Sequence, residues 1–247
     1  MTPDAIRTHA PKILTEAQRE TYFETGFLCA EGLIPDAWLR RLNALSEAFI
    51  DESRGVTESN EAFDIDPRHS SDTPHVRRLR ALVDRHPDFW RFAAESPLAD
   101  IAADLVGPDV KFHSSKLNYK WPGTGEIVQW HRDIPAWRHS NDLPVTLGVY
   151  LTDCPAEQGP LTCLPGTQNG PIFVHRDDAG AWTGSVRAAD MATVDTSRAA
   201  DLVGRAGDIV RGSPAKVAHL DPFPCLVPPD WSKPGYGSIF VAQKAEM

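Results

Sequence analysis

The chain has 247 residues, of which 41% are hydrophobic and 24% charged, a composition typical of a folded protein and not of a disordered or fibrous one. Its 34 acidic residues outnumber the 25 basic ones, and the resulting charge of −9 argues against nucleic acid or an anionic membrane as a partner. No apolar run approaches the roughly 20 residues of a membrane helix, and the N-terminus lacks the apolar core of a secretory signal, so we expect a soluble, cytoplasmic protein.

The first part of the chain, to about residue 107, has the pattern of helices. Thr15 and Gln18 have the spacing of a capping box, in which each side chain satisfies a backbone donor of the other. The helix that this box begins should end near Gly26, a residue type favoured just after a helix. A second helix is predicted from Pro35 to about Ile50, where apolar side chains recur every three or four residues.

Polar residues at 51–74 predict a long loop, and helical signals return at about 75–95. Ser96 and Pro97 are an N-cap and a first-turn proline, and Gly107 marks the end of the helix that they begin.

After Gly107 the sequence changes to short β-type runs separated by glycine and proline. Frequent turn signals between short strands favour an antiparallel jelly roll of the cupin type over alternating strands and helices. We therefore expect a mainly β fold with flanking α-helices, in one domain over 1–247, with a helical layer at about 12–107 and a jelly-roll core at about 108–245. The candidate strands are 110–120, 126–132, 145–152, 160–164, 171–175, 208–211 and 237–243.

The four cysteines are far apart and form no CxxC pair, which argues against a zinc ribbon and a disulfide scaffold. We expect buried free thiols at these positions, which are Cys29, Cys154, Cys163 and Cys225.

The run QWHRD contains His131 and Asp133, two residues apart in a predicted strand, so both side chains lie on one face. One imidazole and one carboxylate can occupy adjacent positions on a metal ion. A non-haem iron facial triad requires a second imidazole, and His219, on a predicted late strand, is the best donor. Antiparallel pairing can bring that strand beside the early one.

Two imidazoles and one carboxylate leave Fe(II) with a charge of about +1 and three open positions. Two of these can chelate a 2-oxo acid and the third can take O₂. Structural zinc usually has four protein ligands, and calcium and magnesium prefer oxygen donors. A second HxD run, His175-Arg176-Asp177, lies in a predicted exposed loop, so we interpret His175 as a surface histidine.

Three ordered blocks of the chain resemble the phytanoyl-CoA dioxygenase family, and especially its ectoine-hydroxylase branch. They are ILTEAQRETYFETGFLCAEGLIPDAWLRRL, HPDFWRFAAESPLADIAADLVGPDVKFHSSKLNYKWPGTGEIVQWHRD and LTDCPAEQGPLTCLPGTQNG. The resemblance implies a double-stranded β-helix with Fe(II), 2-oxoglutarate as co-substrate, and O₂. It also implies a dioxygenase that hydroxylates a C–H bond of a small-molecule substrate.

The resemblance makes His131 and Asp133 the first two iron ligands and His219 the distal one. Asn118 matches a family position near the 2-oxoglutarate carboxylate, and Lys116 lies two residues earlier on the same strand face. The alternative interpretation of this pair is a solvated strand edge. The candidates for substrate contact are Trp137, which follows the HxD run, and Gln129, which precedes it.

The chain departs from the family after His219, where an arginine usually binds the distal carboxylate of 2-oxoglutarate. No arginine follows His219, and Leu220-Asp221-Pro222 replaces the usual Gly/Ser segment. Lys233 and Arg211 are the candidate cations, although a lysine lacks the forked geometry of a guanidinium.

The retained carboxylate of Asp133 favours hydroxylation or desaturation over halogenation, because related iron halogenases lose this carboxylate to make room for chloride. Two other functions stay open at this point. One is a cupin-type metal-dependent isomerase or lyase, which the missing arginine supports, and the other is a catalytically silent homologue that binds a partner.

Overall fold

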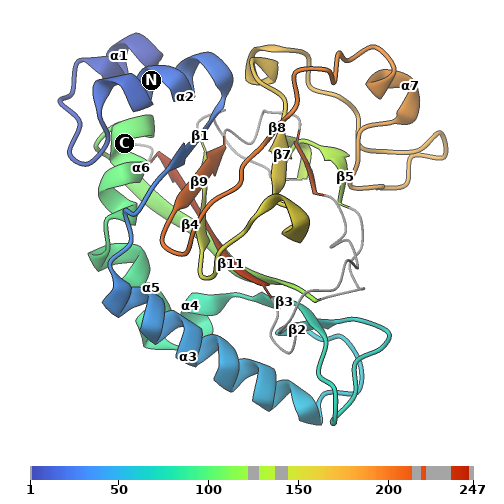
Figure 1. The fold of residues 1–247 in the computed structure, drawn as a ribbon. Coiled ribbons are helices and arrows are strands. Elements are labelled where there is room, and N and C mark those ends of the chain that lie inside the picture. Colours follow the sequence, from blue (N-terminus) through green and yellow to red (C-terminus); the bar gives the residue numbers. More distant parts are fainter. Residues whose placement is uncertain (1, 122–127, 137–143, 213–217, 221–234, 245–247) are drawn as a thin grey trace.

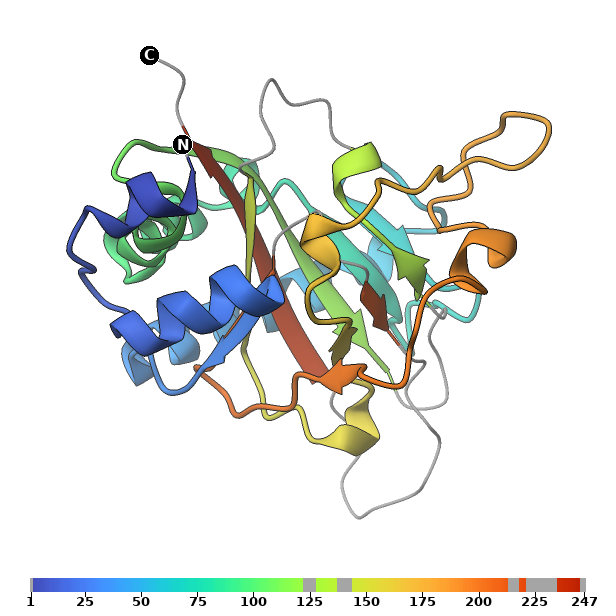
Figure 2. The same ribbon diagram turned by 90° about the horizontal axis from the view of Figure 1, so that it is seen from above.

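The computed structural model describes residues 2–121, 128–136, 144–212, 218–220 and 235–244, the last two segments by their backbone. Two antiparallel β-sheets face each other, and helices pack on the outer face of the larger one (Figure 1). Seen from above, the two longest strands of the larger sheet, β4 and β11, run side by side through the middle of the molecule (Figure 2).

Within the described residues, the larger sheet has seven strands in the order β1-β9-β6-β11-β4-β3-β2, and the smaller has four in the order β5-β10-β7-β8. From β4 onward the chain passes repeatedly between the sheets, so this is the expected double-stranded β-helix, or jelly roll. The bounds are β1 (Phe27–Ala30), β2 (Phe63–Ile65), β3 (Val76–Arg80), β4 (Val110–Lys120), β5 (Val128–His131), β6 (Val145–Tyr150), β7 (Leu161–Cys163), β8 (Ala200–Asp201), β9 (Ile209–Gly212), β10 (Ala218–Leu220) and β11 (Gly235–Lys244).

The helices lie mainly before β4. They are α1 (Pro3–Arg7), α2 (Glu16–Thr25), α3 (Asp36–Glu52), α4 (Leu82–Arg85), α5 (Pro87–Glu95), α6 (Leu98–Val106) and α7 (Ala188–Met191). Short 3-10 turns are η1 (Ser53–Gly55), η2 (Ile134–Ala136), η3 (Ala156–Gln158) and η4 (Thr167–Asn169).

The predicted ends of α2 and α6 are confirmed with one small difference. Thr15 Oγ1 accepts from the Gln18 amide at 3.2 Å and Gln18 Oε1 accepts from the Thr15 amide at 2.9 Å, the reciprocal pair of a capping box. Gly26 ends α2 at φ +84°, a conformation that glycine adopts without strain. In α6 the N-cap is Pro97, one residue later than predicted, while Ser96 Oγ still accepts from the Leu98 amide.

The core lies between the helices and the outer face of the larger sheet. Leu42 on α3 and Ile101 on α6 are fully buried there, with Leu117 of β4 and Leu147 of β6. Full burial of such a side chain contributes about 1.5–3 kcal/mol. This packing, more than helix propensity, holds the helical layer on the sheet.

The region at about 12–107 was expected to form a helical layer, but it also contains three strands of the larger sheet. β1, β2 and β3 extend the larger sheet at its two ends. Residues 76–80 were predicted as part of a helix, but they pair with β2 and with β4 (Leu79 with Leu117). Ala81 then has φ +53°, which ends the extended run before α4 begins. Pairing with β4 therefore overrides the local helical pattern.

The larger sheet has two faces. Its outer face packs against the helices and is here called the core face, and its inner face is turned toward the smaller sheet. In β6, Leu147 and Val149 belong to the core cluster, whereas Tyr150 packs with Cys163 of β7 in the smaller sheet. Residues directly opposite in neighbouring strands share a face. The inner row of Tyr150 therefore continues through Gly237 of β11 to Asn118 of β4.

Residues 171–175 form no strand but begin an irregular segment that leads to α7. Of the cysteines, Cys163 is buried, Cys29 and Cys154 are partly exposed, and all three are free thiols; Cys225 lies outside the described residues. No helix in the described ranges is long and apolar enough to cross a membrane.

Candidate metal centre

His131 and Asp133 lie where the chain leaves β5. His131 Nε2 is 3.8 Å from Asp133 Oδ1, and the side chains keep 20% and 23% of their surface exposed. His131 Nδ1 lies 2.9 Å from the carbonyl oxygen of Gln129. Because a carbonyl oxygen only accepts, Nδ1 of the neutral ring donates to it, and Nε2 carries the lone pair near Asp133. This nitrogen and the carboxylate oxygen can ligate one cation together.

The strand β10 pairs with β5 on one side and with β7 on the other. Ala218 is in register with His131, and His219 is in register with Thr162. The backbone of His219 is thus on the strand next to the one that ends at His131. Among the side chains that the structure describes, no three His, Cys, Asp or Glu are grouped to hold a metal ion, and the His219 side chain is outside that set. Its role as third ligand stays a prediction.

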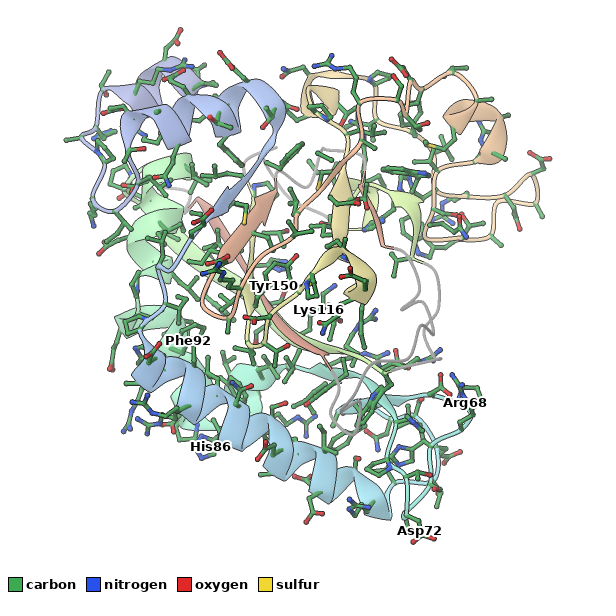
Figure 3. All side chains as sticks on the ribbon, viewed as in Figure 1. Arg68, Asp72, His86, Phe92, Lys116 and Tyr150 are labelled. Carbon is green, nitrogen blue, oxygen red and sulfur yellow. The ribbon has the colours of Figure 1, made fainter. Side chains whose placement is uncertain are left out.

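Lys116 and Asn118 lie on β4, which has β11 on one side and β3 on the other. They are therefore not at a sheet edge, as the alternative interpretation required. Figure 3 shows Lys116 in the middle of the molecule. Burial lowers the pKa of Lys116, the carboxylate of Asp133 opposes this shift, and the Arg78 guanidinium adds to it. The Lys116 ammonium thus lies within electrostatic reach of a predicted iron ligand.

Arg78 on β3 is a candidate anion-binding residue that the sequence reading missed. It is in register with Asn118, and its Nε donates to Asn118 Oδ1 at 3.1 Å. Its Nη1 lies 3.8 Å from Asp64 Oδ2. The same carboxylate pairs with Arg77 at 2.7 Å and with Arg80 at 3.3 Å. Three guanidinium groups therefore gather around the carboxylate of Asp64, and one of them also contacts Asn118.

The signal for Arg78 was present in the run VRRLR at 76–80. Val76 and Leu79 are buried and the arginines between and after them are not. Interpreted as a strand beside β4, this run would have placed arginines next to the candidate co-substrate residues.

Four further residues were predicted for the site, namely Gln129, Arg211, Trp137 and Lys233. The side chain of Gln129 is exposed, and its carbonyl oxygen accepts from His131. The backbone of Arg211 is in register with Leu147 of β6, and its side chain lies outside the described set. Trp137 and Lys233 lie outside the described residues.

His175 was expected at the surface and is instead buried, with 2% of its area exposed. Its Nε2 accepts from the Arg132 amide at 2.9 Å, and its Nδ1 lies 2.9 Å from the carbonyl oxygen of Phe173. Burial lowers the pKa of His175, consistent with a neutral ring in one tautomer. Asp177 Oδ1 accepts from the Ala181 amide. The second HxD run is thus engaged in structural hydrogen bonds, and its histidine contacts the first run.

Arg132, between the two predicted ligands, is also 2% exposed. Its guanidinium donates to the carbonyl oxygens of Gly170, at 3.3 Å, and of Thr167, and lies 5.4 Å from the centroid of the Phe173 ring. Burial lowers its pKa to about 10. The side chain therefore anchors the HxD run to η4.

Comparison with curated proteins gives relatives that are oxygenases by name. A probable alpha-ketoglutarate-dependent hypophosphite dioxygenase of Stutzerimonas stutzeri is 30% identical over 128 residues, which are 50% of this chain and 43% of that protein. An ectoine dioxygenase of Sphingopyxis alaskensis is 28% identical over 157 residues, 60% of this chain and 51% of that protein. The chain thus matches only about half the length of these relatives.

Solved structures share the fold at low sequence identity. EctD from S. alaskensis with bound Fe superimposes with a TM-score of 0.73 at 18% identity, covering 94% of this chain and 77% of that one. SnoK, a non-heme alpha-ketoglutarate-dependent carbocyclase from nogalamycin biosynthesis, superimposes with a TM-score of 0.70 at 19% identity, covering 96% and 88%. These likenesses support the jelly-roll fold found here.

The family profile described as phytanoyl-CoA dioxygenase (PhyH) matches residues 22–214, which include β1 to β9 and the pair His131 and Asp133. This span is more than three quarters of the chain, and it agrees with the resemblance found in the sequence blocks. The chain belongs to the phytanoyl-CoA dioxygenase (PhyH) family.

Proposed function

We propose that this protein is an Fe(II)- and 2-oxoglutarate-dependent dioxygenase that oxidises a C–H bond of a small-molecule substrate. Its iron ligands are His131, Asp133 and His219. The observation that carries the proposal is the 3.8 Å separation of His131 Nε2 and Asp133 Oδ1 in a chain of this family. The strand β10 pairs with β5, so the His219 backbone lies on the strand next to His131, where Ala218 is the residue directly opposite His131. His219 is assigned as the third ligand because a facial triad requires a second imidazole.

Iron supplies the activation of O₂ when it is bound. In the overall reaction one oxygen atom enters succinate and the other enters the hydroxylated product, while C1 of 2-oxoglutarate leaves as CO₂. The decarboxylation supplies two electrons and the substrate C–H bond supplies two, which together reduce O₂. The retained carboxylate of Asp133 favours this hydroxylation over halogenation. The chain's own part is to hold two neutral imidazoles and one carboxylate on one side of the metal.

The co-substrate site that we propose consists of Asn118, Lys116 and Arg78. The first two face the space between the sheets, and Asp133 is near enough to Lys116 for its carboxylate to oppose the lowering of the Lys116 pKa. The Arg78 guanidinium contacts the Asn118 amide at 3.1 Å. This set supplies the cation for the distal carboxylate of 2-oxoglutarate in a chain that has no arginine after His219.

The test of the function uses the purified chain with Fe(II) and 2-oxoglutarate. Under anaerobic conditions a charge-transfer absorption should develop on adding 2-oxoglutarate, and admission of O₂ should yield succinate. His219→Ala should lose both signals. A chain that binds Fe(II) but neither binds nor consumes 2-oxoglutarate would favour the cupin-type isomerase or lyase, and one that binds no iron would favour a silent homologue.

A further inference from the structure

The segment 171–187 contains none of the proposed iron ligands, yet it is hydrogen-bonded to the backbone on both sides of His131. The amide of Val186 donates to the carbonyl oxygen of Trp130 at 2.8 Å. The amide of Arg132 donates to His175 Nε2 at 2.9 Å. The residues before and after a predicted ligand are thus bonded to one remote segment, 40 or more positions later in the chain.

The acceptor on His175 is held in one orientation. Its Nδ1 faces the carbonyl oxygen of Phe173, so the proton must be on Nδ1 and the lone pair on Nε2. Its ring stacks on Trp182, with the centroids 5.6 Å apart and the planes at 17°. Its own carbonyl oxygen accepts from the amide of Thr183 at 3.0 Å. With 2% exposure the ring has little contact with water that could compete for the Arg132 amide.

The Arg132 side chain makes further hydrogen bonds next to the HxD run. Its guanidinium donates to the carbonyl oxygens of Thr167 and Gly170, so both the amide and the side chain of one residue are engaged. That residue is the one between His131 and Asp133. Both predicted ligands are bonded through the backbone to this residue, so a change of its φ or ψ would alter their relative positions. Metal and catalytic sites tolerate only about 0.5 Å or 10–20° of such movement.

We propose that His175 is a positioning residue of the iron site, which fixes the backbone between His131 and Asp133 by accepting the Arg132 amide. The inference rests on the proposed function, because it assigns His175 a role toward the iron ligands. His175 itself touches neither the metal nor the substrate in this role. Its contribution is to hold both ligands at the spacing that iron requires before iron binds.

The test compares two substitutions at this position. His175→Phe keeps an aromatic ring against Trp182 but removes the lone pair, whereas His175→Gln keeps an acceptor that can reach the Arg132 amide. The matched control is His69→Phe, since His69 also bridges two backbone groups. Its Nδ1 accepts from the His75 amide at 2.9 Å and its Nε2 lies 2.9 Å from the Ser53 carbonyl oxygen. It lies in the loop between β2 and β3 of the larger sheet, whereas the HxD run follows from β5 of the smaller sheet.

The readouts are the dissociation constant of Co(II), followed by its visible absorption, and hydrogen exchange of the Arg132 amide in the metal-free protein. Loss of a group that orients metal ligands costs about 10- to 100-fold in metal affinity, so we expect His175→Phe to weaken Co(II) binding at least about tenfold. His175→Gln should restore most of this loss, and His69→Phe should leave the affinity unchanged. The Arg132 amide should exchange faster only in His175→Phe.

Folded His175→Phe with the Co(II) affinity and spectrum of the wild type would overturn the inference. An equal loss in His69→Phe would also overturn it, because the effect would then reflect general destabilisation. Wild-type protein that binds neither Co(II) nor Fe(II) would overturn the proposed function itself and the inference with it. If the wild type binds Co(II) and His175→Phe binds it equally well, the proposed function is retained and only the positioning role of His175 is rejected.

Discussion

The two sheets hold their polar side chains near the proposed iron site in different ways. At the end of β5, Arg132 and His175 are each 2% exposed and are bonded to backbone groups. On β3, the side chains of Arg78 and Arg80 are 38% and 45% exposed and share the carboxylate of Asp64. The first arrangement consists of buried hydrogen bonds to backbone groups, whereas the second gathers partly exposed guanidinium groups around one carboxylate.

The difference separates two tasks of one site. Buried hydrogen bonds to backbone groups fix geometry and are shielded from salt, which suits metal ligands. Long, partly exposed cationic side chains attract an anion but keep conformational freedom, which suits a co-substrate that must enter and leave. Substitutions on the two sheets should therefore affect metal affinity and 2-oxoglutarate affinity separately.

The largest effect is expected at the end of β5. Because loss of an outer-shell partner alone costs about 10- to 100-fold in metal affinity, His131→Ala should weaken Fe(II) binding by more than about 100-fold. Anaerobic Fe(II) titration measures this. The control is His9→Ala, which removes an exposed imidazole near α1 and should bind Fe(II) as the wild type does. Wild-type Fe(II) affinity in His131→Ala would contradict the ligand assignment.

The next effect concerns β3. A hydrogen bond to a charged group contributes about 1.5–3 kcal/mol, so Arg78→Gln should raise the Kd of 2-oxoglutarate at least about tenfold. The Kd of 2-oxopentanoate, which has a methyl group in place of the distal carboxylate, should change little. Fe(II) affinity should be unaffected.

The control for that substitution is Arg77→Gln. Arg77 also pairs with Asp64, at 2.7 Å, but it is not the residue in register with Asn118. If Arg78→Gln weakened both 2-oxo acids equally, Arg78 would not bind the distal carboxylate. If Arg77→Gln had the same effect as Arg78→Gln, the loss would reflect only the general charge of β3.

A smaller effect of opposite sign is expected at Asp64, the carboxylate that the three arginines share. Since a partly exposed charge pair contributes about 0.5–1 kcal/mol, Asp64→Asn should lower the Kd of 2-oxoglutarate by about threefold. The same titration with 2-oxoglutarate measures it. Weaker binding in this variant would show that Asp64 orients Arg78 more than it neutralises it.

The smallest effect comes from salt. The screening length falls from about 10 Å at 0.1 M to about 3 Å at 1 M, so this change should raise the Kd of 2-oxoglutarate by about twofold. The buried hydrogen bonds around Arg132 should leave Fe(II) affinity nearly constant over the same range, once the metal ion's own activity is corrected. If salt changed the Fe(II) affinity as much as the 2-oxoglutarate affinity, the two sheets would not differ in the way they hold their polar side chains.

The local elements were predictable where a short stretch of chain decides them. Thr15 and Gln18 form the expected capping box, and Gly26 ends α2. The strand predicted at 110–120 has the observed bounds of β4. Residues 76–80 were predicted wrongly, because arginines between two buried apolar residues fit a helix as well as a strand, and only pairing with β4 distinguishes them.

The HxD motif of the site was predictable from the sequence, whereas the residues that contact the motif from distant parts of the chain were not. His131 and Asp133 are close because the sequence places them two residues apart. The contact of His175 with Arg132 spans 43 positions, and the row of Arg78 and Asn118 spans 40. Neither contact follows from a local sequence pattern, so the sequence gives no local signal that His175 is buried or that Arg78 contacts Asn118.

The sequence by itself determined the helix ends, most of the strands, the HxD pair and the family, because each depends on neighbouring residues or on ordered blocks of residue types. The tertiary structure decided which strands became neighbours, which face each side chain shares, and which histidine is buried. These depend on contacts between residues far apart in the chain, and such contacts form only when burial of the common core compensates the entropy of closing long loops.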